Sequence, residues 1–233
     1  MSGFGTEHLT EWGDFFTHNP ASRHRRRILT AWLDRLTFDS VLDVGCGDGS
    51  LLEEFRKRFH CKVFGLDADE SPATAALHSK LDGFYALDIS KKKPDRAFDV
   101  IVCAEALEHM PDDVSALANL HALCGRHLLI TVPAGRMRQT DVHMGHVRHY
   151  TLESLRSKVT AAGFTVRESF AWGFPFHSLY KAMQDVVPNQ IMTGFGNVKY
   201  GFLQKTISRL LYWMFLLNSR NSGCQLFLLA EKL

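Results

Sequence analysis

Apolar residues along the chain alternate between short unbroken runs and stretches with helical spacing. Unbroken runs are typical of buried strands, and three- and four-residue spacing is typical of helices that cover a sheet. Strand-like runs occupy 41–44, 62–66, 83–87, 98–103, 127–132, 164–171 and 225–230, and helix-like stretches lie near 49–59, 72–81, 112–124 and 151–162. This alternation predicts an α/β fold with a mostly parallel sheet and helices on both faces.

An amphipathic helix is expected before the first strand. Pro20 suits the first turn of a helix, and its apolar positions recur at three- and four-residue steps opposite a run of arginines. These positions are Ile28, Leu29, Trp32, Leu33 and Leu36. We therefore predict a helix that caps the sheet, after a loosely ordered arm.

The alternation stops after Trp172. An irregular stretch around Pro188-Asn189 and Gly194-Phe195-Gly196 precedes an apolar helix over 202–217. The predicted organisation is one domain, divided into an arm and cap helix (1–37), a core (38–172), a helical insertion (173–223) and a final strand (224–233).

A glycine-rich turn follows the first strand. Gly45, Gly47 and Gly49 form G-x-G-x-G, whereas a dinucleotide fingerprint would place its third glycine at Ser50. Asp43 stands just before the turn, where a carboxylate repels a pyrophosphate but suits an ammonium or sulfonium charge. Asp67, at the end of the second strand, has the offset at which such folds place a carboxylate on a ribose. These residues predict a nucleoside ligand that is locally cationic.

Four successive motifs resemble those of class I S-adenosylmethionine-dependent methyltransferases. They are Asp43-Val-Gly-Cys-Gly-Asp-Gly49, Asp67, Leu87-Asp88-Ile89 and Phe98-Asp99-Val-Ile-Val-Cys103-Ala-Glu105-Ala-Leu-Glu-His109, and the resemblance extends over about residues 40–172. It implies a Rossmann-like, seven-stranded sheet whose last strand is antiparallel and inserted beside the sixth. It also implies S-adenosyl-L-methionine as the cofactor.

The resemblance also implies roles for the motif residues. The three glycines would bend under the methionine portion, Asp43 would hold its amino group directly or through a bridge, and Asp67 would accept from both ribose hydroxyls. Asp88, with the Ile89 backbone, would bind the adenine amino group, and the stretch from Cys103 to Glu105 would line the methyl-donor region. The full predicted cofactor set is Asp43, Gly45, Cys46, Gly47, Gly49, Asp67, Ala68, Asp88, Ile89, Cys103, Ala104 and Glu105. Asp48 is expected to be a turn cap.

Histidines are the candidate bases on the acceptor side. His109 lies in a Glu-His pair common at this place in the family, and His143 and His146 lie in a loop over 141–150 whose Gly-His-x-Arg-x-Tyr pattern resembles an acceptor-binding segment. Each is either a catalytic base or a residue that caps or holds the loop. Arg148, Tyr150, Phe174 and Tyr180 are the predicted substrate contacts.

A metal site is the alternative for these histidines. His143, His146 and His149 follow at three-residue steps, but Gly145 and the lack of a paired carboxylate motif count against a preformed site. The prediction is that no metal is bound.

The composition excludes several other classes. The 233 residues include 27 Lys and Arg against 25 Asp and Glu, a formal charge of +2 that does not indicate nucleic acid. Two local basic runs, 23–27 and 91–93, are interpreted as solvated faces. The five cysteines are scattered without C-x-x-C pairing, which favours a reducing compartment. No secretory leader or apolar run of spanning length is found, and we expect a cytoplasmic protein.

The predicted function is methyl transfer to a small molecule with an apolar part, at oxygen and with a histidine base. N- or C-methylation remains open, as does a methyltransferase-like binding or scaffold protein without turnover. An NAD-dependent oxidoreductase would need glycine at 50. Nucleic-acid base methyltransferases carry an Asn/Asp-Pro-Pro-aromatic motif where this chain has Cys103-Ala-Glu-Ala106.

The insertion is the predicted lid over the acceptor, together with the 141–150 loop. Its aromatic and flexible apolar side chains exceed what a polar connector needs. They are Phe174, Phe176, Tyr180, Met183, Phe195 and Tyr200. The helix over 202–217 is apolar on nearly all sides, so it is buried in the domain, forms a homodimer interface or makes shallow contact with a membrane.

Overall fold

The computed structural model describes residues 17–69, 80–186 and 200–233. Three predictions lie outside these residues: the arm before residue 17, most of the helix near 72–81, and the irregular stretch that contains Phe195.

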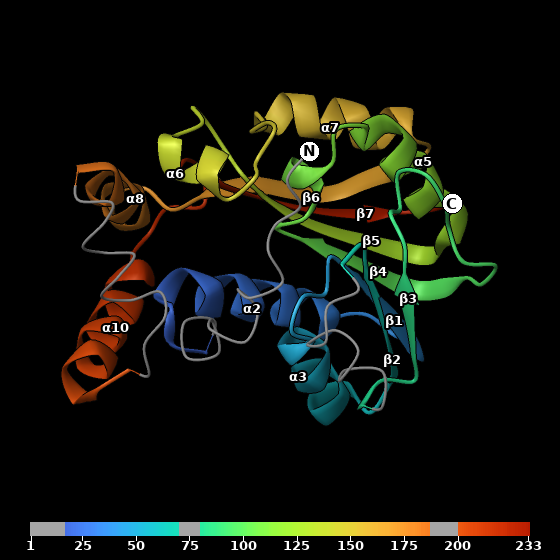
Figure 1. Cartoon of the computed structure of the whole chain (residues 1–233), viewed down its shortest axis with the longest axis horizontal. Coiled ribbons are helices and arrows are strands. Elements are labelled where there is room, and N and C mark those ends of the chain that lie inside the picture. Colours follow the sequence, from blue (N-terminus) through green and yellow to red (C-terminus); the bar gives the residue numbers. More distant parts are fainter. Residues whose placement is uncertain (1–16, 70–79, 187–199) are drawn as a thin grey trace.

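A seven-stranded sheet forms the centre of the molecule (Figure 1). Its strand order is β3-β2-β1-β4-β5-β7-β6; all neighbours pair in parallel except β7, which runs antiparallel to both β5 and β6. The strands are β1 (Ser40–Val44), β2 (Lys62–Asp67), β3 (Gly83–Ala86), β4 (Phe98–Ala104), β5 (Cys124–Pro133), β6 (Thr165–Trp172) and β7 (Gln225–Glu231). The predicted fold class, including the inserted antiparallel last strand, is confirmed.

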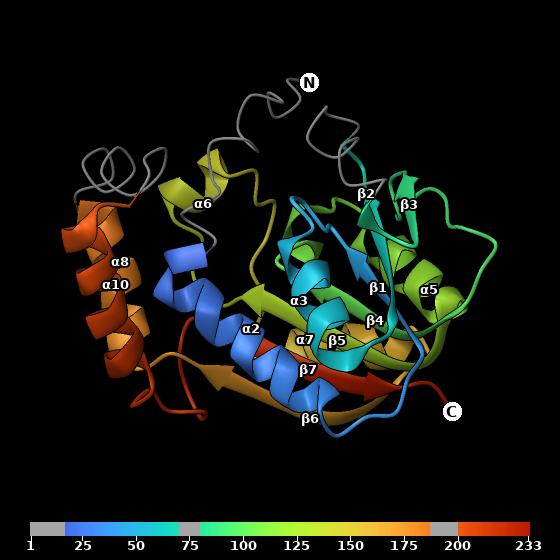
Figure 2. The same ribbon diagram turned by 90° about the horizontal axis from the view of Figure 1, so that it is seen from below.

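Helices cover both faces of the sheet, as the alternation predicted (Figures 1 and 2). On one face, α2 (Pro20–Leu33) and α3 (Ser50–Phe59) bury apolar side chains against the strands, and on the other face α5 (Asp113–Leu123) and α7 (Leu152–Ala161) do the same. The cap helix begins where the sequence indicated, because the Asn19 carboxamide accepts from the amides of Ala21 and Ser22. Thr151 likewise caps α7 through the Ser154 amide.

The remaining short elements lie beyond the ends of the strands. They are η2 (Leu107–His109), α6 (Gln139–His143), α8 (Phe176–Val186) and α10 (Phe202–Phe215). The helices α8 and α10 lie side by side at one end of the sheet, and α10 packs against α2 (Figure 2). Between β6 and β7 the chain thus adds helical structure on the side where the parallel strands end.

Candidate active site

The carboxyl end of β1 places Asp43 in the interior. Its side chain is only 3% exposed, and its Oδ1 has no hydrogen-bond partner among the described residues. Burial raises the pKa of Asp43 to about 8, and Asp67 and Asp48 add to the shift while Arg26 opposes it. A buried carboxylate oxygen without a partner is costly unless a ligand supplies one, and a cationic group suits it.

The turn after β1 needs glycine at two positions for different reasons. Gly45 has φ +75°, and an added Cβ would lie 2.6 Å from the Cβ of Ala106. Gly47 has φ +50° and nothing within 4 Å of where its Cβ would stand, so its backbone faces open space. The loop therefore allows a ligand to approach the main chain closely.

Asp67 at the end of β2 is oriented by main-chain amides. Its Oδ2 accepts from Gly47 N at 2.9 Å, and its Oδ1 accepts from Asp69 N at 3.0 Å. Both oxygens keep a second lone pair, so the fixed carboxylate can accept two hydroxyls. The side chain is partly exposed, and Ala68 beside it is exposed.

Several other predicted cofactor residues serve the fold with their side chains. Asp88 accepts from Ser90 N and Oγ at 3.0 and 2.6 Å and pairs with Lys91. Ile89 is buried, and its carbonyl accepts from Asn119. Asp48 caps Ser50, as predicted.

Two predicted cofactor contacts are corrected in part. The side chains of Cys46 and Cys103 pack in the two hydrophobic cores, and Cys103 is 0% exposed. Short apolar thiols fill the space next to the strands there, and both residues are buried as a whole. Ala104, at the end of β4, is half-buried.

Together, these features fit S-adenosylmethionine. It has a positive charge that suits the buried Asp43 oxygen and ribose hydroxyls that Asp67 can accept, and it could approach the main chain at Gly47, where nothing lies within 4 Å of an added Cβ.

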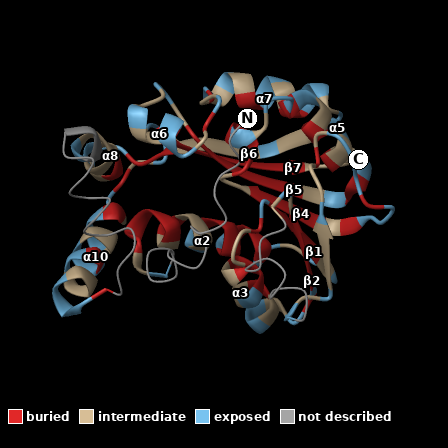
Figure 3. Ribbon diagram, viewed as in Figure 1, coloured by how far each residue is buried: buried red, intermediate tan, exposed pale blue. Residues whose placement is uncertain are grey.

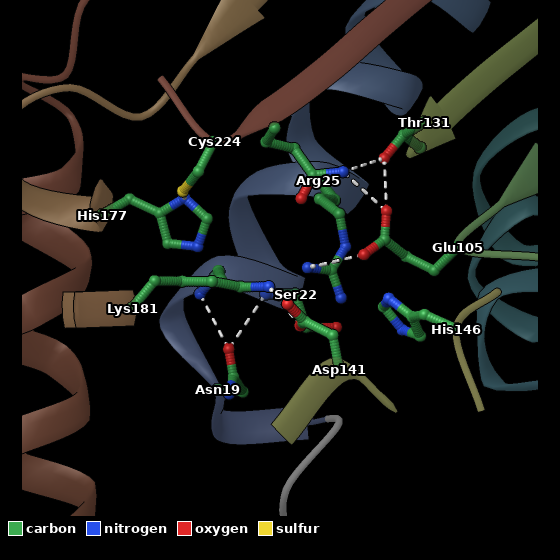
Figure 4. Close-up of polar contacts among 12 residues, drawn as sticks. Asn19, Ser22, Arg25, Glu105, Thr131, Asp141, His146, His177, Lys181 and Cys224 are labelled. Carbon is green, nitrogen blue, oxygen red and sulfur yellow. Dashed lines mark hydrogen bonds and ion pairs between the residues drawn. The ribbon is translucent and has the colours of Figure 1, made fainter. Parts of the chain in front are cut away.

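Glu105, directly after β4, is held by three other segments (Figure 4). Its Oε1 accepts from Thr131 Oγ1 at 2.9 Å and from Gln225 Nε2 at 2.6 Å, and its Oε2 lies 3.5 Å from Arg25 Nη1. It is a non-glycine residue with φ +56°, a conformation that costs free energy and is common at functional sites. The sequence analysis assigned Glu105 to the cofactor and missed Arg25, which projects from the arginine run of α2 toward this carboxylate.

A second polar group joins the loop after β5 to the insertion. Lys181 Nζ of α8 lies 3.4 Å from Asp141 Oδ1, and His149 Nε2 lies 3.4 Å from Asp141 Oδ2. Arg138 Nη1 donates to the Lys181 carbonyl at 2.8 Å. In Figure 4, Lys181, Asp141, Glu105 and His146 face a common space. Lys181 was not among the predicted site residues. Its position four residues after His177 places both on one side of a helix, which was the available indication in the sequence.

Of the three predicted bases, His109 and His146 lie in contact, and His143 does not contact either of them. The rings of His109 and His146 lie 4.7 Å apart, edge to face, and His146 Nδ1 lies 3.1 Å from His149 Nε2. Burial, with His109 beside it, lowers the pKa of His146 to about 4. His109 as a whole residue is exposed, but loss of water where its ring packs against His146 lowers its pKa as well. Both imidazoles are therefore neutral near pH 7 and able to accept a proton.

His143 lies apart from the other two candidate bases. It is exposed at the end of α6, and its Nδ1 contacts the Gln139 carbonyl at 2.8 Å one turn earlier. The loop turns at Gly145, so the three-residue spacing of the histidines does not continue a helix and only His146 and His149 come together.

Arg148 and Tyr150 are corrected as substrate contacts. Arg148 donates to the carbonyls of Met110 and Pro111, and the buried Tyr150 hydroxyl donates to Asp113 Oδ2 at 2.8 Å. These bonds tie the loop to the segment after β4. Both side chains are occupied in holding the loop.

The aromatic residues predicted for the lid also point elsewhere. Tyr180 packs against Phe215 and His177, with ring centroids 5.7 and 6.5 Å away, and Phe174 is 55% exposed. Because α8 turns its aromatic face to α10 and the interior, it presents Lys181 to the 141–150 loop.

Two groups of side chains could hold a metal ion in the part of the chain that the structure describes. Ligand atoms lie within 4.8 Å of one another in the set Glu108, His109 and His146 and in the set Asp141, His146 and His149. Neither oxygen of the buried Glu108 has a partner among the described residues, and burial together with Glu105 raises the pKa of Glu108 well above its ordinary value. The neutral acid that this favours is a poor metal ligand. In the second set, Asp141 already pairs with Lys181 and His149. The absence of a metal stays our prediction.

With fold and site described, comparison with known proteins places the chain in a family. The sequence profile of the methyltransferase domain matches residues 16–169, and the chain belongs to that family. Strand order and family together make it a class I S-adenosylmethionine-dependent methyltransferase, as the motifs predicted.

Individual relatives match over shorter lengths or at lower identity. The ubiquinone biosynthesis O-methyltransferase of Pseudomonas paraeruginosa is 36% identical over 103 residues, which is 40% of this chain and 44% of that protein. The chain thus matches less than half the length of this curated relative.

Two solved structures share the fold. The phosphoethanolamine N-methyltransferase 2 of Haemonchus contortus, in complex with S-adenosyl-L-methionine, has a TM-score of 0.66 at 14% identity and covers 98% of this chain and 57% of its own. The 1,6-didemethyltoxoflavin-N1-methyltransferase of Burkholderia thailandensis has a TM-score of 0.61 at 22% identity, with 97% and 84% covered. Among the described residues, no helix combines the length and hydropathy needed to cross a membrane.

Proposed function

We propose that this protein methylates a hydroxyl oxygen of a small molecule and that His146 or His109 removes the hydroxyl proton. The observation that carries this proposal is the pair of neutral imidazoles beside Glu105, on the edge of the sheet where the parallel strands end. Relatives named as O-methyltransferases support oxygen, whereas solved neighbours named as N-methyltransferases leave nitrogen as the competing acceptor.

S-adenosylmethionine, when bound, supplies a methyl group on a positively charged sulfur, which is already a good leaving group. The protein therefore has to position the acceptor and take its proton. Asp43, the glycine turn and Asp67 would hold the cofactor on the β1 and β2 side. An imidazole nitrogen of His146 or His109 would accept the proton as the acceptor oxygen bonds to the methyl carbon.

The acceptor would lie between Glu105 and the loop that carries His146. Arg25 and Lys181 each already face a carboxylate, so this space is close to electrically neutral and does not require a charged acceptor. Phe174 would lie at the outer edge of the insertion and contact only an extended apolar portion.

The test uses S-adenosylmethionine with a carbon-13 methyl group and a metabolite extract as the source of acceptors. Carbon-13 NMR of the products distinguishes methyl groups on oxygen, nitrogen and carbon. We expect an O-methyl signal that is lost when both His109 and His146 are replaced by Ala. Signals only from N-methyl or C-methyl groups would overturn the oxygen assignment, and cofactor binding without any product would favour the scaffold alternative.

A further inference from the structure

The helix α10 exposes most of its apolar side chains. Within α10, only Ser208 and Phe215 are buried. Leu203 at the start of the helix, Leu210 in its middle and Leu217 just beyond its end are 70%, 60% and 73% exposed. Simple burial in the domain, one of the three readings of this helix, therefore does not hold for this face.

The exposed side chains follow one side of the helix. Leu203, Ile207, Leu210, Met214 and Leu217 recur at four- and three-residue steps, which places them in a single row. Phe202 and Trp213 flank the row and are 87% and 66% exposed. We call these seven residues the outer apolar face; Figure 3 shows how much of α10 is exposed.

The neighbouring helix α8 adds to this exposure. Leu179 and Met183, one turn apart, are 59% and 57% exposed, while Lys181 between them lies at Asp141 of the candidate active site. One surface of α8 thus serves the site and another carries apolar groups outward. Contiguous apolar groups on a surface mark a contact with another apolar phase or partner, whereas single ones do not.

The charged side chains of α10 and of the segment after it have one sign. The sequence holds no Asp or Glu between Asp185 and Glu231, although acids are nearly as numerous as bases in the whole chain. Lys205 and Arg209 lie on α10 itself, whereas Arg220, which follows it, lies over the Phe170 ring of β6. The long aliphatic stems of Lys205 and Arg209 allow the charges to reach a polar layer above an apolar one.

We propose that the outer apolar face binds the surface of an anionic lipid bilayer, with α10 lying in the interfacial plane. The combination of a leucine row, an exposed tryptophan and flanking cations without acids is the pattern of helices that insert one face among lipid headgroups. No described helix is long and apolar enough to span the bilayer, so the contact is with the surface.

A second copy of the chain fits this face less well. A two-fold interface over this face would place the cations Lys205 and Arg209 of both copies at one contact, and the segment offers no carboxylate to compensate them. An anionic headgroup layer supplies that compensation. Membrane contact does not depend on the methyl-transfer proposal, but it would bring the active site close to lipid-dissolved acceptors.

The experiment is flotation of the full chain with vesicles of phosphatidylcholine alone or mixed with phosphatidylglycerol. We expect binding to the anionic vesicles that weakens with salt, and at least tenfold weaker binding in Leu210→Glu/Trp213→Glu. Val114→Glu is the matched control: Val114 is 64% exposed on α5, outside the outer apolar face, and its replacement should leave binding unchanged. Lys205→Glu/Arg209→Glu should lower binding to the anionic vesicles only.

Circular dichroism melting of each variant confirms that it is folded, which exposed positions should permit. The proposal is overturned if the folded wild-type chain does not float with anionic vesicles, or if Leu210→Glu/Trp213→Glu and Val114→Glu bind equally. It is also overturned if light scattering finds a dimer that Leu210→Glu/Trp213→Glu separates while vesicle binding is absent.

Discussion

The cofactor half and the acceptor half of the site are built by different means. The cofactor half uses a glycine turn and carboxylates at the ends of adjacent parallel strands, and its parts lie within one stretch of sequence. The acceptor half gathers single side chains from α2, β4, the 141–150 loop, α8 and β7. The cofactor half can therefore be predicted from residue spacing in the sequence, whereas the acceptor half can be recognised only in the folded chain.

The two halves also respond to pH in opposite directions. Burial raises the pKa of Asp43 in the cofactor half and lowers the pKa of His146 in the acceptor half. Both shifts favour the neutral form, because both groups lose water. Each half is therefore sensitive to a different pH range, which gives measurements that separate them.

The largest effect is expected from the acceptor histidines. Replacing His146 or His109 by Ala removes a candidate base and should lower turnover of the responsible variant by about 10²- to 10⁴-fold, with cofactor affinity unchanged. If His146 is the base, its pKa of about 4 means that wild-type turnover should be flat above pH 6 and fall only toward pH 4. His143→Ala, in the same loop but exposed, is the control. Full activity in both single variants would leave positioning alone as the mechanism.

The next effect concerns the cofactor half. Asp43 is protonated below its pKa of about 8 in the free protein and should ionise when it meets the cationic cofactor. Affinity for S-adenosylmethionine should therefore rise roughly tenfold per pH unit up to pH 8 and then level off. Calorimetry in buffers of different ionisation enthalpy should detect the released proton. Asp43→Asn should release none; a proton release equal to that of the wild type would rule out this role.

A smaller effect is expected on acid stability. His24 lies among Trp172, Tyr212 and Phe215, and burial lowers its pKa to about 4. In the unfolded chain His24 binds a proton near pH 6.5, whereas in the folded chain it stays neutral until about pH 4. Protonation of His24 therefore does not reduce the free energy of unfolding above pH 6.5. As pH falls from 6.5 toward 4, the free energy of unfolding decreases by at most about 3 kcal/mol because of this group.

His24→Phe should flatten this part of the stability profile. Urea denaturation at a series of pH values measures it, with His143→Gln as an exposed control. An unchanged slope in His24→Phe would mean that other groups govern acid unfolding.

The smallest effect is expected from chelation. If Glu108 is a neutral acid beside His109 and His146, dialysis against EDTA should change methyl transfer by less than about twofold. Loss of activity that returns with added Zn²⁺ would contradict the prediction that no metal is bound, and would assign those side chains as ligands.

Prediction from sequence succeeded at positions where a turn or a helix cap close in the sequence requires one type of residue. Gly45, Pro20 and Thr151 are each required by their own turn or cap, and the strand pattern was sufficient for the sheet order once the family resemblance was added. Asp67 lies at the end of β2 as the pattern predicted, and its oxygens accept from the amides of Gly47 in the glycine turn and of Asp69. Its role toward a ribose stays a prediction.

The sequence did not reveal side chains whose partners lie far along the chain. Arg25 looked like one of several surface arginines, and nothing in its neighbourhood indicates Glu105, eighty positions later. Tyr150 and Arg148 are residue types that often contact substrates. In this protein, however, they donate hydrogen bonds to Asp113 and to two backbone carbonyls. The sequence showed that the segment of α10 is apolar. The side of the helix that is exposed, however, depends on its packing against α2 and α8.

The central claim is that the strand-end carboxylates form a site for a methyl donor, and ligand-dependent melting tests it most directly. S-adenosylhomocysteine at a hundred times its dissociation constant should raise Tm by about 5 to 10 °C, and NAD should not. Asp67→Ala should abolish the shift, and Asp34→Ala, which removes an exposed ion pair with Arg58, should keep it. Stabilisation by NAD alone, or an undiminished shift in Asp67→Ala, would contradict the account.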